Sequence, residues 1–139
     1  MTFVLDNSVT MRWCFGDGSD RDRAYARKVL DMAEESTLMV PAVWGLEVAN
    51  IIARAERNGL WTESRTREFL EMLNSLDIEV DEETSLRALT DTLEMARRYK
   101  LSSYDASYLE LASRLNSPLA TLDESLRKAA KKAGIPIAN

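Results

Sequence analysis

The sequence contains no histidine and only one cysteine. The absence of histidine excludes imidazole general bases, serine–histidine–aspartate triads and histidine-bound zinc. The single cysteine, Cys14, excludes a disulfide within the chain and a metal cage built from cysteines. Because Cys14 lies between Trp13 and Phe15, we expect it to be a buried apolar residue and not a reactive thiol.

Proline and glycine are also scarce, with 3 and 5 in 139 residues, so we expect a single folded domain over residues 1–139. A membrane-spanning helix needs about 20 apolar residues, and no run approaches that length. The first residues lead directly into a strand-like segment, which predicts no secretion signal and a cytoplasmic location. The net charge of −5 argues against a protein that coats nucleic acid through a basic surface, but it suits an acidic site for cations.

Short apolar segments alternate with segments of helical periodicity, which indicates the α/β class. The parallel sheet that this order predicts lies between two layers of helices, and its ligands bind beyond the carboxyl ends of the strands. The expected strands are residues 2–5, 38–40, 77–80 and 119–122, with 135–137 as an edge strand. The expected helices are residues 23–35, 43–58, a helix capped by Thr62, 84–99 (with Leu86, Leu89, Leu93 and Ala96 on its apolar face), 103–115 and 123–133.

Four acidic residues occupy positions that a purely structural pattern would fill differently. Asp6 and Asp123 each follow directly after a predicted strand, whereas Glu47 and Asp105 lie in the first turns of predicted helices, beside the apolar face. Each has an ordinary structural alternative. The two aspartates after strands are well placed for turns or N-caps, and the two helical acids for complementing the helix dipole.

The four positions together favour a functional site, because all of them are expected at one edge of the sheet. Four carboxylates at one place would repel one another unless cations bound between them. Oxygen ligands select hard cations, Mg²⁺ or Mn²⁺. Such cations activate water and stabilise the leaving oxygen in phosphoryl transfer, so the pattern predicts a metal-dependent nuclease.

The same positions lie in motifs that resemble those of the PIN-domain family, and specifically of VapC-type toxins from toxin–antitoxin pairs. The motifs are VLDNSV at residues 4–9, VPAVWGLEVAN at 40–50, YDASYLELA at 104–112 and ATLDESL at 120–126. Their order and spacing cover nearly the whole chain. One departure is Asn7, where the family often has a small residue.

The resemblance implies a three-layer α/β/α domain with a central five-stranded parallel sheet and a metal-dependent ribonuclease activity. It implies catalytic, metal-binding roles for Asp6, Glu47, Asp105 and Asp123. Ser8 and Thr121 match supporting positions that orient these acids. It also implies a homodimer that is inhibited by a VapB-type antitoxin.

Basic and aromatic residues near these motifs are candidates for RNA contacts. Arg12, Arg54, Arg97, Arg98 and Lys100 are the candidates for holding phosphates. For the last three, complementing a helix C-terminus is an equal alternative. Trp13, Phe15 and Trp61 are able to stack on bases, but we expect them to pack within the core or a dimer.

Two other functions are compatible with parts of the pattern. A catalytically silent PIN-like module would bind RNA or protein without cutting it, but it predicts a missing acid, and none is missing. A phosphoacceptor receiver domain needs adjacent acids after the first strand and a lysine after a late strand, and neither is present. Without histidine to activate a 2′-hydroxyl, we expect water to attack phosphorus and leave 5′-phosphate and 3′-hydroxyl ends.

Overall fold

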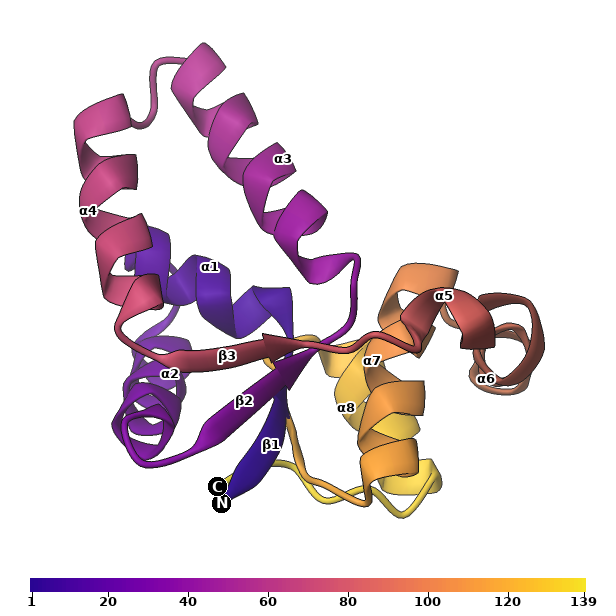
Figure 1. Cartoon of the computed structure of the whole chain (residues 1–139). Coiled ribbons are helices and arrows are strands. Elements are labelled where there is room, and N and C mark those ends of the chain that lie inside the picture. The colour runs from indigo at the N-terminus through magenta and orange to yellow at the C-terminus, as the bar shows by residue number, and fades with distance from the viewer.

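The computed structural model describes all 139 residues, and its centre is a short parallel sheet (Figure 1). The strands are β1 (Thr2–Leu5), β2 (Thr37–Val40), β3 (Asp77–Val80) and β4 (Leu119–Ala120). Their order in the sheet is β3-β2-β1-β4, and every neighbouring pair is parallel. The first strand is therefore central, and its carboxyl end lies between those of β2 and β4.

The prediction of a fifth strand at residues 135–137 was wrong. This segment makes only one isolated parallel bridge, between Ile137 and Leu119. The Leu119 N–H donates to the Pro136 carbonyl at 2.9 Å, and the Ala138 N–H donates to the Leu119 carbonyl at 2.9 Å. A regular ladder does not form, because Pro136 has no N–H to donate and β4 is only two residues long.

Helices fill every connection between the strands. They are α1 (Asn7–Phe15), α2 (Asp20–Ala33), α3 (Trp44–Arg57), α4 (Glu63–Asn74), α5 (Thr84–Arg87), the π-helical turn η1 (Ala88–Thr92), α6 (Leu93–Tyr99), α7 (Ser103–Leu115) and α8 (Glu124–Lys132). None of them is long and apolar enough to cross a lipid bilayer. The expected helices are confirmed to within a few residues, and Thr62 caps α4 by accepting the Arg65 N–H at 3.2 Å.

Alternation of side chains along β1 divides the core into two layers. Phe3 and Leu5 pack with Val29 of α2 on one face of the sheet. Val4, between them in sequence, packs on the other face with Leu109 of α7 and with α8. Successive strand residues point to opposite faces, so both faces are covered, which confirms the predicted three-layer arrangement (Figure 1).

Helix α1 was not predicted from the sequence. It begins directly after Asp6 and ends at Gly16, whose φ of +65° is a left-handed conformation that favours glycine. Its nine residues alternate apolar and polar types without a clear stripe, and most of one side is nevertheless buried against α2 and α3. Cys14 is buried there, as expected, and the Trp13 indole N–H donates to the Ala26 carbonyl at 2.7 Å.

The predicted helix over residues 84–99 is present, but only half of its predicted apolar stripe is correct: Leu93 and Ala96 are half-buried, whereas the other two residues are exposed. Leu86 is 76% exposed and Leu89 is 83% exposed. The π-helical turn η1 interrupts the α-helical spacing, and the buried side of the segment is formed by Thr92 and, in part, Met95. Two large leucines are thereby left on the surface.

Helices α3 and α4 form a hairpin that extends away from the sheet (Figure 1). Its base packs against α1 in a third apolar cluster, in which Val48 and Ile52 of α3 meet Phe69 and Leu73 of α4. This packing sets the direction of α3 and therefore the position of its first turn relative to the carboxyl end of β1.

A buried ion-pair network ties the segment after β3 to α7. The Arg114 guanidinium donates to Asp81 at 2.6 Å and to Glu110 at 2.9 Å, and all three side chains are nearly buried. Burial alone would raise the pKa of Asp81, but hydrogen bonds from Arg114 and Thr84 outweigh it and hold the pKa below its ordinary value. The stabilisation is present above the ordinary carboxyl pKa and is lost as the pH falls through the lowered one.

We predict that Arg114→Ala lowers the free energy of unfolding by about 3–5 kcal/mol, because Asp81 and Glu110 would stay buried without a counter-charge. Urea denaturation followed by circular dichroism measures the loss. The matched control is Arg97→Ala, which removes a 3.7 Å ion pair with Glu94 between two exposed side chains and should change the value by less than about 1 kcal/mol. Equal, small losses in both variants would contradict the prediction.

Candidate active site

Asp6 lies at the carboxyl end of the central strand and is only 2% exposed. One carboxylate oxygen, Oδ2, accepts hydrogen bonds from the Ser8 hydroxyl at 2.6 Å and the Thr121 hydroxyl at 2.8 Å. The other oxygen, Oδ1, is buried and has no hydrogen-bond partner. Burial raises the pKa of Asp6, and the nearby charge of Asp123 raises it further, while the hydrogen bonds oppose the shift. An unpartnered buried carboxylate oxygen is costly unless a ligand satisfies it.

Ser8 and Thr121 join the ends of β1 and β4 around Asp6. The Ser8 hydroxyl accepts the Leu122 N–H at 2.9 Å, and the Thr121 hydroxyl accepts the Asp123 N–H at 3.0 Å. Each hydroxyl therefore contacts Asp6 on one side and the chain after β4 on the other. The two residues that the sequence motifs assign as supporting positions hold Asp6 in place.

Glu47 lies in the first turn of α3 and is half-buried. The hydroxyl of Tyr108, a buried residue of α7, donates to its Oε1 at 2.6 Å. Burial raises the pKa of Glu47, and the charges of Asp6 and Asp105 raise it further, although the bond from Tyr108 opposes the shift. Tyr108 was not predicted as a site residue. Its spacing of three residues from Asp105 places both on one helix face, which is the feature of the sequence that could have identified it.

Asp105 is the third residue of α7, and its N–H donates to the hydroxyl of the N-cap Ser102 at 3.1 Å. The carboxyl group lies at the positive end of the helix dipole, which would favour its charged form. Even so, burial, together with the charges of Asp123 and Asp6, raises the pKa of Asp105 to about 6. The repulsive surroundings outweigh the dipole, so this position is not explained by helix stability alone.

Asp123 is the N-cap of α8, as its structural alternative predicted. Its Oδ1 accepts the Leu126 N–H at 3.1 Å. This bond uses one of the two carboxylate oxygens, and the charge still raises the pKa of both Asp6 and Asp105. The Asp123 side chain therefore caps α8 and also belongs to the acidic group.

The four acids come from four separate segments and lie near one another beyond the carboxyl ends of β1 and β4, because charges within the group raise the pKa values of Asp6, Glu47 and Asp105. None of them forms an ion pair with a lysine or arginine, although other carboxylates of the chain do. As the side chains stand, no three of them are close enough together to hold one metal ion. Mg²⁺ is often held by one or two carboxylates and several waters, so such a cage is not required. The all-oxygen donor set and the unpartnered Asp6 Oδ1 fit a hard cation.

The basic residues singled out in the sequence are dispersed and not gathered at the acids. Arg12 is paired with Asp17 at 2.9 Å, and Arg98 lies 5.7 Å from the ring of Tyr99 on α6. Lys100 is the left-handed C-cap of α6, as its structural alternative predicted. Arg54 is exposed on α3, seven residues after Glu47, and so lies two turns along the same helix side.

The aromatic candidates pack within the chain. Phe15 and Trp61 meet edge to face with ring centroids 4.8 Å apart, and Arg65 lies 5.3 Å from the Trp61 ring. Trp13 is partly buried between two apolar clusters. The expected packing is confirmed for all three.

We predict that Asp105→Asn raises the melting temperature of the metal-free protein at pH 8. A carboxyl pKa raised to about 6 means that stability is fully present below the ordinary carboxyl pKa and is lost as the pH rises through about 6. Asn removes that loss, worth about 1 kcal/mol after discounting for solvent screening, or about 4 °C. Differential scanning fluorimetry from pH 4 to pH 8 should show the gain disappearing at pH 4. Asp31→Asn, at an exposed site on α2, is the control, and an equal gain there would contradict the assignment.

The fold agrees with what comparison with known proteins shows. The PIN domain family matches residues 3–132. Ribonuclease VapC3 of Pyrobaculum aerophilum is 30% identical over 107 residues, which are 77% of this chain and 79% of that protein.

Two crystal structures share the fold. That of PAE2754 from Pyrobaculum aerophilum has a TM-score of 0.67 at 21% identity, covering 93% of this chain and 79% of the other. That of VapBC2 from Rickettsia felis, bound to a DNA fragment from their promoter, has a TM-score of 0.66 at 11% identity, covering 100% and 98%. The chain belongs to the PIN-domain family, among its VapC-type members.

Proposed function

We propose that this protein is a metal-dependent endoribonuclease, the toxin component of a toxin–antitoxin pair. The observation that carries the proposal is the group of four carboxylates at the carboxyl edge of the sheet, with no basic partner and with an unpartnered oxygen on Asp6. The relative named Ribonuclease VapC3 supports RNA as the substrate. A silent binding module would have no need of four mutually repelling acids, which destabilise the metal-free protein.

Asp6, Glu47, Asp105 and Asp123 are the residues that would hold a divalent cation, Mg²⁺ or Mn²⁺. Such a cation supplies positive charge that offsets the carboxylates, polarises water and stabilises charge on the phosphate oxygens. Ser8 and Thr121 fix Asp6 through its Oδ2, which keeps Oδ1 available.

Tyr108 fixes Glu47 in the same way, through a 2.6 Å hydrogen bond to one oxygen. The supporting hydroxyls thus restrict each carboxylate to one orientation, which lowers the entropic cost of binding. Attack of water in line with the 3′-oxygen leaves 5′-phosphate and 3′-hydroxyl ends, and no step needs the 2′-hydroxyl as a nucleophile.

The test is incubation of purified, antitoxin-free protein with total RNA, followed by mapping of the cleaved ends. We predict cleavage that stops in EDTA, returns with excess Mg²⁺ or Mn²⁺, and yields 5′-phosphate and 3′-hydroxyl ends. Asp6→Asn should reduce the rate by at least about 10²-fold while the protein stays folded, because the amide keeps the shape but lacks the charge that holds a cation.

The matched control is Asp31→Asn, which removes one carboxylate from an exposed site and should leave the rate unchanged. Cleavage that persists in EDTA, or 2′,3′-cyclic phosphate ends, would show that the carboxylate group does not perform this chemistry. A wild-type rate for Asp6→Asn in Mg²⁺ would show that Asp6 is a structural cap.

We also propose a VapB-type antitoxin as the inhibitor, and an apolar groove along the α3–α4 hairpin as one part of its site. The groove has a volume of about 350 Å³ and includes Val48, Ile52 and Leu70. It lies on the helix that carries Glu47, so a segment with an apolar face and a basic side chain would fill the groove and reach the acids. The structure of a complex named VapBC2 supports a partner of this class.

We also propose a homodimer. The structure indicates which exposed apolar residues would form its interface. The large apolar side chains of Trp61, Met72 and Met95 do not supply a free dimer surface, because each is partly buried against an apolar cluster of its own chain. Leu86 and Leu89 are exposed instead and lie close together on one segment.

We predict a particle of twice the 15.7 kDa chain mass by light scattering at micromolar concentration. Leu86→Ser with Leu89→Ser should shift it to the monomer mass, because the double substitution removes the exposed apolar pair. Leu60→Ser, at a 77% exposed site in the α3–α4 loop, is the control and should remain dimeric. Wild-type protein that is monomeric at this concentration would contradict the dimer.

A further inference from the structure

A concave site lies beside the acidic edge, and its charge has the opposite sign. It is a cleft of about 860 Å³ between α2, α8 and the C-terminal segment. Four cationic and only two acidic side chains line it, whereas the whole chain has a net charge of −5. The cations are Arg21, Arg127, Lys128 and Lys131. We refer to this site as the basic cleft.

Arg127 is held rigidly within the basic cleft. Its Nε donates to the Thr121 carbonyl at 2.7 Å, and its guanidinium lies 4.6 Å from the ring centroid of Tyr25. The Tyr25 hydroxyl donates in turn to the Ala138 carbonyl at 2.8 Å, which fixes the ring. The Arg127 guanidinium makes no ion pair with a carboxylate. A guanidinium that is held on one side and has no carboxylate to offset its charge is arranged to bind a phosphate.

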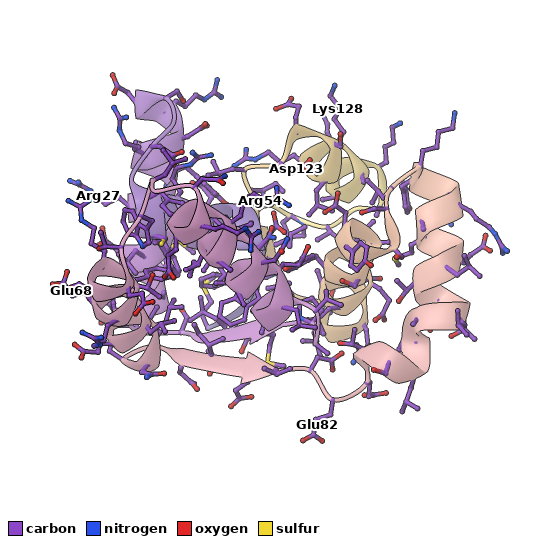
Figure 2. The ribbon with its side chains drawn as sticks, turned by 90° about the horizontal axis from the view of Figure 1, so that it is seen from above. Arg27, Arg54, Glu68, Glu82, Asp123 and Lys128 are labelled. Carbon is purple, nitrogen blue, oxygen red and sulfur yellow. The ribbon has the colours of Figure 1, made fainter.

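The contact with Thr121 joins the basic cleft to the acidic edge. The hydroxyl of Thr121 donates to Asp6, and its carbonyl accepts from Arg127. Thr121 therefore contacts both sites directly. Lys128 and Lys131 follow Arg127 on α8. Figure 2 shows that Lys128 lies on this helix, away from the N-cap Asp123. The cations therefore form a row that begins beside the acids.

We propose that the basic cleft binds the phosphates of the RNA strand that occupies the acidic site. The inference rests on the proposed ribonuclease function. A row of cations along a helix suits a polyanionic strand better than one isolated phosphate, and a basic row offsets the repulsion between RNA and the acids. The side of the cleft formed by Tyr25 and Ile137 is apolar enough to contact a base or a sugar.

The test measures binding of a fluorescent single-stranded RNA by anisotropy in EDTA, where no cleavage is expected, over a range of salt concentrations. The variant is Arg127→Gln/Lys128→Gln/Lys131→Gln. We expect at least a tenfold rise in Kd and a salt slope that is lower by about 2, because each lost phosphate contact with a single strand removes about 0.7. Lys132→Gln, on the same helix but outside the basic cleft, is the control and should bind as the wild type does.

The variant Arg127→Lys distinguishes the effect of the positive charge from the effect of the hydrogen bond to Thr121. It keeps the charge and loses the Thr121 contact, so it should retain most of the salt slope, and melting curves of all variants confirm that they fold. An unchanged Kd for the triple variant, an equal loss in Lys132→Gln, or no binding of RNA by the wild type would overturn the proposal. A triple variant that binds RNA normally but loses an acidic peptide such as polyglutamate would assign the cleft to protein instead.

The proposed activity is tested independently of this inference. Normal RNA binding without cleavage in Mg²⁺ would reject the ribonuclease function and leave the basic cleft as an RNA site. Normal cleavage with an unaltered KM in the triple variant would reject the cleft and leave the activity.

Discussion

The buried carboxylate of Asp6 at the end of the central strand is the constraint on which the surrounding structure depends. A carboxylate that loses nearly all contact with water needs hydrogen-bond donors or a cation. The chain supplies two hydroxyls, from Ser8 and Thr121, and both go to the same oxygen. The same two hydroxyls also link the ends of β1 and β4. The hydrogen bonds that hold Asp6 therefore also connect the strands at the carboxyl edge of the sheet.

The protein contains two kinds of buried or half-buried acid, and their partners distinguish them. Asp81 and Glu110 share Arg114, and the pKa of Asp81 is lowered as a result. Glu47 and Asp105 have no such cation, and their pKa values are raised. The first pair stabilises the fold at neutral pH. The second pair reduces stability unless a positive charge arrives from outside, which is the usual character of a site built for function.

Positive charge is also kept apart from the acids on the surface around the site. A strand of RNA and a group of carboxylates repel each other, so an active site of this kind needs positive charge nearby but not in contact with its acids. The basic cleft meets this need, because Arg127 binds the far side of Thr121 and not the carboxylates. Tyr25 and Thr121 hold its guanidinium in place.

The sequence by itself determined the strand–helix order, the class of fold and the four acids, because each depends on short-range patterns of apolar and polar residues. Three features could not be predicted from these patterns. Helix α1 mixes polar and apolar residues without a clear stripe, and a π-helical turn moves Leu86 and Leu89 to the surface. The fifth strand does not form, because Pro136 and the short β4 prevent a regular ladder. Only the tertiary structure decided which side chains meet. Glu47 and Tyr108 are 61 residues apart, and Asp6 and Thr121 are 115 apart. Contacts over such distances arise from how the layers pack, and no local pattern in the sequence encodes them.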